Sequence, residues 1–288
     1  MALSLILFAA SGLASPYSPH SPEVPAATIT PGPIPPFQPG ALASGALGRV
    51  NDESSDSNGE YTITPSGHGT AVGGALDPSH TPPPNVGAID PPPPLMTITF
   101  VNKHNMAVST THGRNSGAPA ATSGNVAPGT IAVGASAAFA VPTNWAGRVA
   151  VAEARWGPLT DGRYASLLEA NFNYAAGYGV AVPDFDVSYV DAYSVPMTCA
   201  CNGQTLAGCN KALFGLHTCP AGDNHSGSCY NPLKADNSAT AATAFFAPCS
   251  RAAYTYPNDN EANSYGVCQS AQVTCCIGAA CPPGPKQS

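Results

Sequence analysis

All ten cysteines of this 288-residue chain lie between Cys199 and Cys281. An even number of clustered cysteines is typical of a chain whose disulfides form in an oxidising compartment. The long stretch before Cys199 has no cysteine, so it must fold without cross-links of its own. The cysteines therefore divide the chain into an uncross-linked part and the cysteine-rich region 199–281, and we expect the disulfides to staple that region alone.

The first 94 residues hold 18 of the 31 prolines. Proline runs such as 31–36, 81–84 and 91–94 favour polyproline II and leave little to bury, so we expect 15–94 to be a disordered Pro/Ser/Gly-rich spacer. The apolar run 1–14 before it is typical of a signal peptide. No later segment has about eighteen unbroken apolar residues, so no transmembrane segment is predicted.

Charged side chains make up only 9% of the chain, with 10 basic against 17 acidic residues and a net charge of −7. So few basic residues argue against nucleic acid as a partner, because phosphate binding needs concentrated Lys and Arg. Residues 1–94 hold seven acids and one base, whereas 161–191 hold five acids and one base and form a local acidic cluster. The seven histidines are scattered without zinc spacing, so we predict neither a metal nor a cofactor.

Residues 95–288 are expected to form one all-β domain. Segments 96–101 and 185–190 alternate apolar and polar residues, and 131–134, 137–141 and 148–152 are further short strand candidates. Short strands separated by Gly, Pro and Asn turns indicate a sandwich or a barrel. Segment 209–214 is expected to be a short helix, while 167–170 fits a helix or a strand.

One segment is specific enough to suggest a family. It reads Asp186-Val-Ser-Tyr-Val-Asp191-Ala-Tyr-Ser-Val-Pro196-Met197, and it resembles a segment of the thaumatin-like proteins, the family of osmotin. Other pieces follow that family's order over about residues 95–281, namely 97–103, 145–149, 165–169, Phe245-Phe246 and 253–256. The first-strand cysteine and the early cysteine-rich loops of the family are missing. In this respect the chain is similar to the reduced type of filamentous fungi.

The resemblance implies a flattened antiparallel β-sandwich with a small disulfide-rich second region and an acidic cleft between them. Arg148, Glu169, Asp186 and Asp191 match four of the five cleft residues, but the chain reads Ser-Arg-Ala over 250–252 where the family has an aspartate. The family pattern also implies the disulfides Cys199–Cys268, Cys201–Cys249 and Cys209–Cys219. Three connectivities stay open for Cys229, Cys275, Cys276 and Cys281.

The resemblance further implies a secreted monomer of the extracellular space or cell wall that binds β-1,3-glucan, with or without weak hydrolysis. Hydrolysis would make it a glycoside hydrolase of the endo-β-1,3-glucanase type and would need an acid and a second carboxylate. Glu169 is the candidate acid, Asp186 the second carboxylate with Asp191 as a substitute, and Arg148 the residue that holds a carboxylate ionised. The alternative is a non-enzymatic secreted antifungal, effector or wall-structural protein.

Each of these residues also has a structural reading. An aspartate at a strand end often caps a turn, and Arg148 with Glu169 fits a structural ion pair. Asp186 and Asp191 are five residues apart, so on one flat strand they would point to opposite faces. They can share a site only if the strand ends or bulges between them.

Two further features bear on sugars. Tyr174, Tyr178 and Tyr193 are candidates for stacking on sugar rings, with core packing as the alternative. Asn224-His225-Ser226 is the one N-glycosylation sequon, which a secreted route would make usable.

Overall fold

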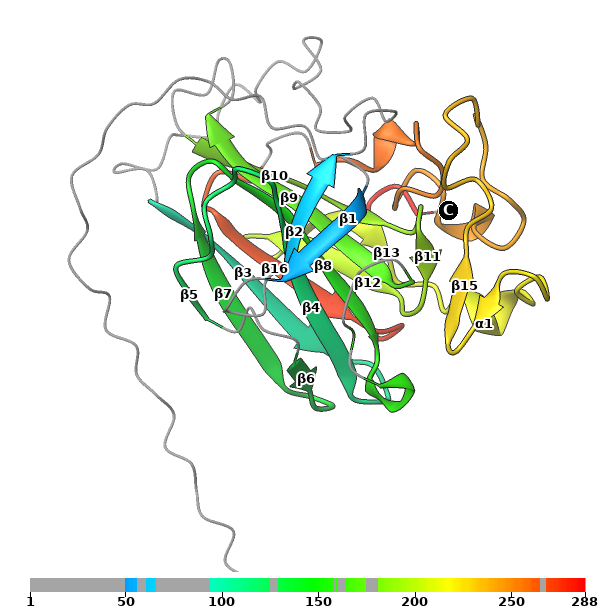
Figure 1. Cartoon of the computed structure of the whole chain (residues 1–288). Coiled ribbons are helices and arrows are strands. Elements are labelled where there is room, and N and C mark those ends of the chain that lie inside the picture. Colours follow the sequence, from blue (N-terminus) through cyan, green and yellow to red (C-terminus); the bar gives the residue numbers. More distant parts are fainter. Residues whose placement is uncertain are drawn as a thin grey trace, which may run out of the picture. The chain divides into compact units, whose positions relative to one another are not determined.

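The computed structural model of the chain (Figure 1) describes residues 50–55, 61–65, 94–124, 129–157, 159, 164–174, 181–264 and 268–287. The chain divides into two units, 1–41 and 42–288, and every described residue belongs to the second. The predicted signal peptide and most of the predicted spacer lie outside the described residues. Within that spacer, β1 (Val50–Ser55) and β2 (Tyr61–Pro65) pair as antiparallel strands.

Two β-sheets form the body of the second unit. The six-stranded sheet has the order β13-β12-β16-β3-β7-β5, and the seven-stranded sheet has the order β1-β2-β4-β8-β9-β10, with β6 paired to β4. Their described strand pairs are antiparallel, except that β16 runs parallel to β3 and β2 to β4. The bounds are β3 Leu95–Asn102, β4 Val108–Asn115, β5 Ser123–Gly124, β6 Gly129–Ile131, β7 Ser136–Pro142, β8 Trp145–Glu153, β9 Ser166–Tyr174, β10 Ala181–Ser188, β12 Met197–Cys201, β13 Gln204–Cys209 and β16 Gln272–Ile277.

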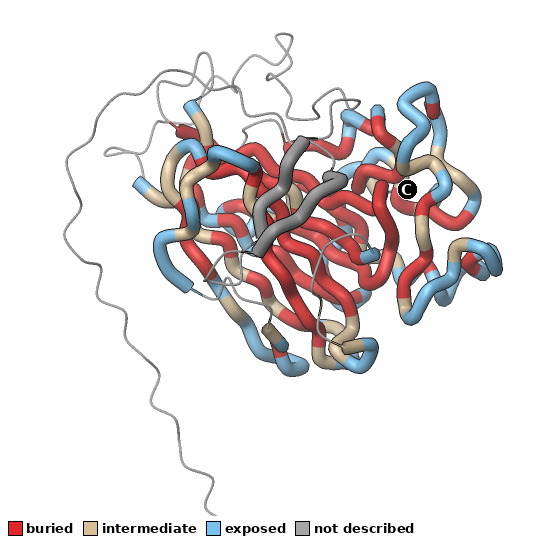
Figure 2. Tube along the Cα trace, in the orientation of Figure 1, coloured by how far each residue is buried: buried red, intermediate tan, exposed pale blue. Residues whose placement is uncertain are grey.

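The hydrophobic core lies between the two sheets. Met96, Ile98 and Phe100 alternate along β3 and are buried in one cluster with apolar side chains of the seven-stranded sheet. Phe139 of β7 meets Trp145 of β8 edge to face, with ring centroids 6.1 Å apart. Buried residues follow the strands of both sheets in Figure 2. The fold is thus the flattened, mostly antiparallel β-sandwich that the sequence predicts, because two apolar sheet faces are buried against each other.

A smaller second region, residues 210–264, is drawn yellow to orange in Figure 1. Its elements are α1 (Leu213–Leu216), η2 (Ala247–Cys249), η3 (Asn260–Ala262) and the strands β14 (Asn224–His225) and β15 (Ser228–Tyr230), which pair in the order β11-β15-β14 with β11 (Ala192–Tyr193). The backbone of Tyr254 bonds to Val187 and Tyr189 at the end of β10, each at 2.8 Å. The second region thereby covers the edge of the strand that carries Asp186.

The described cysteines form five disulfides, but the pairs implied by the family are wrong. Strand register places Cys199 of β12 directly opposite Cys275 of β16, with their Cα atoms 4.0 Å apart, so Cys199 bonds to Cys275 and not to Cys268. Cys201 and Cys209 likewise bond to partners other than those that the resemblance implies. The remaining pairs are Cys201–Cys268, Cys209–Cys249, Cys219–Cys229 and Cys276–Cys281.

The expectation that disulfides staple only a region beside the sandwich is also wrong. Cys199 and Cys275 join two neighbouring strands of the six-stranded sheet. Cys209 ends β13 of the same sheet and is bonded to Cys249 in η2. The covalent network therefore ties the second region to the sandwich, because strands 197–209 and 272–277 belong to both the cysteine-rich segment and the sheet.

The strand predictions hold where the chain alternates in hydrophobicity. Segments 96–101, 137–141, 148–152 and 185–190 correspond to β3, β7, β8 and β10, and the ambiguous segment 167–170 lies in β9. Segment 131–134 contributes only Ile131 to β6, and the helix expected over 209–214 begins only at Leu213. Each difference lies at the boundary of an element, which a hydrophobicity pattern defines least well.

Strand β4 has no counterpart in the sequence-based expectations. Its residues Ser109, Thr110, Thr111 and His112 are buried although they are polar, so no apolar alternation marks the strand. The ring of His112 lies 4.5 Å from that of Phe139 in the core, and burial lowers its pKa to about 3. His112 is accordingly a neutral packing residue at physiological pH.

Candidate functional site

Three of the predicted site residues form one row across adjacent strands. Arg148 of β8 lies directly opposite Glu169 of β9, and Glu169 lies directly opposite Asp186 of β10. Directly opposed residues of antiparallel strands project from the same face of a sheet. Their neighbours Val149 and Leu168 belong to the core, so the row projects from the other, outer face of the seven-stranded sheet. We call Arg148, Glu169 and Asp186 the charged row.

Asp191 reaches the charged row from outside the ladder. Strand β10 ends at Ser188, so the chain turns before Asp191, and the condition for a site shared with Asp186 is met. A carboxylate oxygen of Asp191 lies 3.7 Å from a guanidinium nitrogen of Arg148, and its other oxygen lies 3.2 Å from Nζ of Lys234. Asp191 thus links the sandwich to the second region through two cations.

Two more polar side chains extend the row by one register step. Asp184 and Asn171 are directly opposite each other and lie two residues along β10 and β9 from Asp186 and Glu169. Asn171 donates its side-chain N–H to a carboxylate oxygen of Asp184 at 3.4 Å. Sequence reasoning missed both, although strand alternation extended by one residue before the predicted strand 185–190 would have placed Asp184 on the face of Asp186. No sequence signal marks Lys234.

The surroundings of Asp186 favour the neutral form of its carboxyl group. The residue is 2% exposed, and its Oδ1 atom has no hydrogen-bond partner in the described part of the chain. Burial, and after it the neighbouring charges of Glu169 and Asp184, raise the pKa of Asp186 well above its ordinary value. Asp186 is therefore a buried acid that keeps its proton to a higher pH than an exposed aspartate.

We expect the Asp186→Asn variant to be more stable than the parent protein at neutral pH. Folding raises the pKa of Asp186 above its unfolded value of about 3.9, so the folded state binds more protons and the parent loses stability as pH rises through the folded pKa. The amide does not titrate, so the two proteins should differ little below about pH 4 and increasingly above it. Urea unfolding at a series of pH values measures the difference.

The matched control for that experiment is Asp236→Asn, an exposed aspartate in the second region. Its side-chain hydrogen bond from Ser238, together with the backbone N–H of Ser238, lowers the pKa of Asp236. The sign is therefore reversed, and this variant should lose stability relative to the parent above about pH 4. A flat difference between Asp186→Asn and the parent at all pH values would contradict the neutral-acid assignment.

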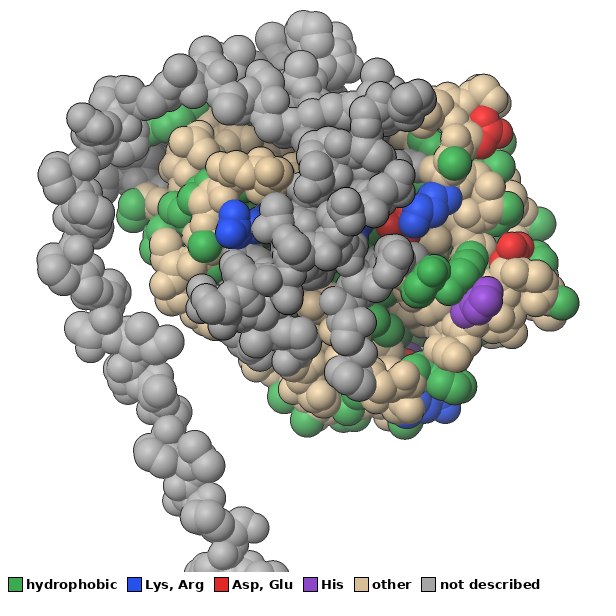
Figure 3. Space-filling model, viewed as in Figure 1, with side chains coloured by type: hydrophobic (Ala, Val, Ile, Leu, Met, Phe, Trp, Pro, Cys, Tyr) green, Lys and Arg blue, Asp and Glu red, His purple; other side chains and the backbone are tan. Residues whose placement is uncertain are grey.

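The charged row is not exposed as an open acidic cleft. Arg148 is 4% exposed and Asp191 8%, and only Glu169 is partly accessible. Figure 3 shows how few charged side chains the described part of one face carries. A ligand would accordingly reach the row through Glu169.

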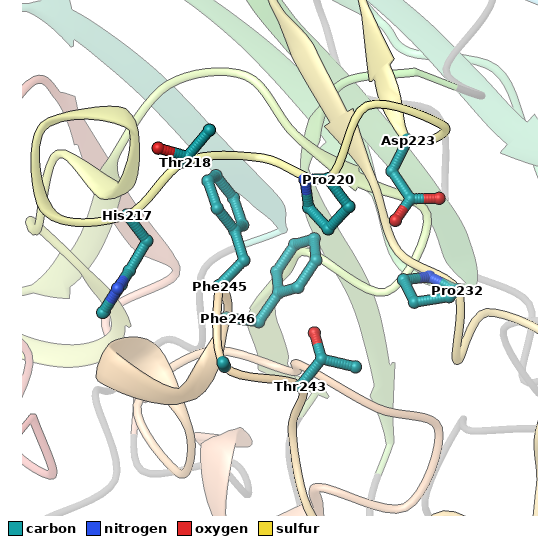
Figure 4. A pocket seen from close by; sticks show the side chains of 9 residues that line it. His217, Thr218, Pro220, Asp223, Pro232, Thr243, Phe245 and Phe246 are labelled. Atoms are coloured by element: carbon teal, nitrogen blue, oxygen red, sulfur yellow. The ribbon is translucent and has the colours of Figure 1, made fainter.

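A cavity of about 340 Å³ lies in the second region and not at the charged row. Phe245 and Phe246 project side by side into it, with His217, Asp223 and two prolines around them (Figure 4). The two phenylalanines belong to an aromatic cluster that includes Tyr193, which is 1% exposed and packs edge to face against Phe245. Of the tyrosines predicted to stack on sugars, Tyr193 is thus a core residue, Tyr174 is exposed, and Tyr178 lies outside the described residues.

The segment that lacks the fifth cleft aspartate is fixed by other contacts. The guanidinium group of Arg251 forms an exposed ion pair with Glu261 at 2.9 Å. Asp259, which is buried, accepts hydrogen bonds from the backbone N–H of Arg251 and from the hydroxyl group of Thr255. The carboxylate of Asp259 therefore holds its own loop together.

No protein-family model matches the chain, and no curated protein matches it. Among the described residues, no helix is long and apolar enough to cross a membrane. The five disulfides indicate folding under oxidising conditions. Arguments about function therefore rest on the geometry of the site.

Proposed function

We propose that the chain is a secreted, monomeric thaumatin-like protein of the reduced fungal type that binds β-1,3-glucan of the cell wall. The observation that carries the proposal is the meeting of Arg148, Glu169, Asp186 and Asp191 on one outer face of the sandwich. The family resemblance selects these four residues from sequence alone. If the resemblance were a coincidence, there would be no reason for these four side chains to lie together in the folded chain.

Weak hydrolysis is consistent with the same geometry, but with the roles of the two carboxylates exchanged. A general acid must hold its proton until it transfers it to the leaving oxygen. Asp186 suits that role because its pKa is raised. Glu169 lies opposite Arg148, is the more accessible of the two carboxylates, and suits the nucleophile. Directly opposed residues place their Cβ atoms about 5 Å apart, nearer the carboxyl spacing of retaining enzymes than the 6.5–9.5 Å or so of inverting ones.

The test is incubation of the purified protein with soluble and insoluble β-1,3-glucan. We expect the protein to sediment with the insoluble polymer and to release reducing sugar slowly. Glu169→Gln and Asp186→Asn should each lower that release by about 100-fold or more, because each removes one of the two required carboxyl groups. The exposed Glu261→Gln is the control and should change neither quantity. Absence of both sedimentation and release would refute glucan as the ligand.

A non-enzymatic secreted antifungal, effector or wall-structural protein is the second candidate function. Two observations favour it: Arg148, Asp186 and Asp191 are buried, and Arg251 pairs with Glu261 beside the place where the family has its fifth aspartate. Glucan binding without any release of reducing sugar, unchanged by Glu169→Gln, would select this candidate. Release that Glu169→Gln abolishes would exclude it.

A further inference from the structure

Four aromatic side chains gather on the β14–β15 hairpin, and none of them belongs to the charged row. Trp156 is the last residue of η1 (Ala154–Trp156), Tyr164 precedes β9, and His225 and Tyr230 belong to the hairpin itself. Trp156 is 50% exposed and Tyr164 45%. We call these four residues the aromatic platform. Figure 3 shows hydrophobic side chains beside a histidine on the surface near β15.

Three rings of the platform form one stack. The ring of Tyr230 lies 4.4 Å from that of Tyr164 at an interplanar angle of 11°, and 4.0 Å from that of His225 at 16°. Tyr164 and His225 are themselves inclined by 24°. Near-parallel rings in contact fix one another's orientation, so the exposed faces and edges are presented in a defined arrangement.

The hairpin under the stack is rigid. Ser226 and Gly227, the two turn residues, have φ angles of 34° and 85°, the positive values of a two-residue hairpin turn. Cys229 of β15 is bonded to Cys219, and the hydroxyl group of Ser228 donates a hydrogen bond to the backbone carbonyl of Tyr164. The covalent and hydrogen-bonded frame therefore holds Tyr164 against β15.

Trp156 is fixed to the same hairpin from its other side. Its indole lies so close to Gly227 that a Cβ atom there would overlap the ring. The guanidinium group of Arg155 lies 5.0 Å from the ring centroid of Trp156. Arg155 also forms an ion pair with Glu153 at 2.5 Å, and Glu153 in turn pairs with His104 at 2.8 Å. An exposed tryptophan held in this way loses little conformational entropy when a ligand stacks on it.

The dimensions of the platform fit a polysaccharide chain better than a protein. Its two most exposed side chains offer on the order of 200 Å² of surface, whereas a standard protein interface buries about 800 Å² per partner. A β-linked glucan presents flat ring faces of C–H groups with hydroxyl groups at the rim, so it can stack on isolated aromatic rings. The guanidinium group of Arg155 beside the rings is paired with Glu153, so this cation is not free to select an anionic polymer.

We propose that the aromatic platform is a binding site for neutral β-linked glucan, separate from the charged row. The choice of polymer rests on the proposed function, but the binding chemistry is stacking and needs none of the four charged residues. The platform holds the polymer, and any hydrolysis takes place at the charged row.

The first test is sedimentation with insoluble β-1,3-glucan. Trp156→Ala and Tyr164→Ala should each weaken binding by about tenfold, a loss of about 1.4 kcal/mol. Phe214→Ala is the matched control, because Phe214 is an aromatic residue of α1 that is 43% exposed and lies outside the platform, and it should bind like the parent protein. Urea unfolding of each variant checks that it is folded, and His225→Ala replaces any variant that is not.

The second test uses the two tryptophans of the chain as internal probes. Trp145 is fully buried and Trp156 half exposed, so acrylamide should quench mainly Trp156. Soluble β-1,3-glucan oligosaccharides should protect it, and Trp156→Phe should remove the protected signal. Unchanged quenching together with unchanged sedimentation of both alanine variants would overturn the platform.

The outcomes separate the platform from the proposed function. If platform variants lose sedimentation while Glu169→Gln keeps it, the platform is the binding site. If Glu169→Gln loses sedimentation and the platform variants keep it, the platform proposal fails and the charged row stands as the binding site. A change in oligomeric state on size-exclusion chromatography of Trp156→Ala, with sedimentation unchanged, would identify the surface as a protein contact and overturn the proposal.

Discussion

Replacing Arg148 with methionine is expected to lower the free energy of unfolding by about 3–5 kcal/mol at neutral pH. The guanidinium group is 4% exposed, lies 3.7 Å from the carboxylate of Asp191 and comes from the position opposite Glu169. Removing one partner of a buried charged group leaves the remaining carboxylates uncompensated in a region of low dielectric constant. Urea unfolding at about pH 7 measures the cost.

Arg251→Met is the matched control for this variant. Arg251 is also ion-paired, to Glu261 at 2.9 Å, but its side chain is 63% exposed and that of Glu261 60%. Exposed pairs contribute about 0–1 kcal/mol, so this substitution should have a small effect. Equal costs for the two variants would show that Arg148 does not balance the buried carboxylates, and the charged row would lose its electrostatic basis.

The family resemblance selects the residues of the charged row from the sequence, and local patterns place only Asp186 and the chain break before Asp191. The alternation around Phe185 and Val187 identifies a strand with one apolar face, so Asp186 must lie on the other face. The odd spacing to Asp191 requires a break in that strand, and β10 does end at Ser188. Which residue of β8 or β9 stands opposite Asp186 is a matter of register, and there the family resemblance adds what alternation cannot provide.

Other features of the site depend on tertiary structure and escape the sequence. The exposed fraction of Arg148 depends on what covers the outer face of the sheet, so an open cleft is predicted where the structure has a buried row. The aromatic platform joins residues 164, 225 and 230 by ring stacking and adds Trp156 by its contact with Gly227, and no periodic pattern links positions so far apart. The contact between Lys234 and Asp191 likewise depends on how a loop of the second region folds against the sandwich, which no sequence pattern indicates.

The cysteine pairing also depends on tertiary structure and therefore could not be predicted from the sequence. Cys199 and Cys275 are 76 residues apart, and they meet because β12 and β16 pair in a particular register. Moving that register would change which cysteines lie opposite each other without altering the sequence. Assigning Cys268 to Cys199 takes it from Cys201, and assigning Cys249 to Cys201 takes it from Cys209, so the three implied bonds fail together.

Replacing Cys209 and Cys249 together with alanine is expected to lower the free energy of unfolding by about 3–4 kcal/mol. The bond closes a loop of 40 residues, which the Cys219–Cys229 bridge shortens by 10. Both sulfur atoms are buried where β13 of the sandwich meets η2 of the second region. Most of the loss should therefore come from the extra freedom of the unfolded chain, with lost packing added to it.

The matched control removes Cys276 and Cys281, whose bond closes only 5 residues and should contribute about 2 kcal/mol. Urea unfolding of the two double variants compares the losses, and digestion of the unreduced parent protein should release a fragment that joins Cys209 to Cys249. Recovery of Cys209 bonded to Cys219 would contradict the pairing in the structure. Equal losses for the long and short loops would instead leave the pairing intact and show that the bond acts through local packing at the junction between sandwich and second region.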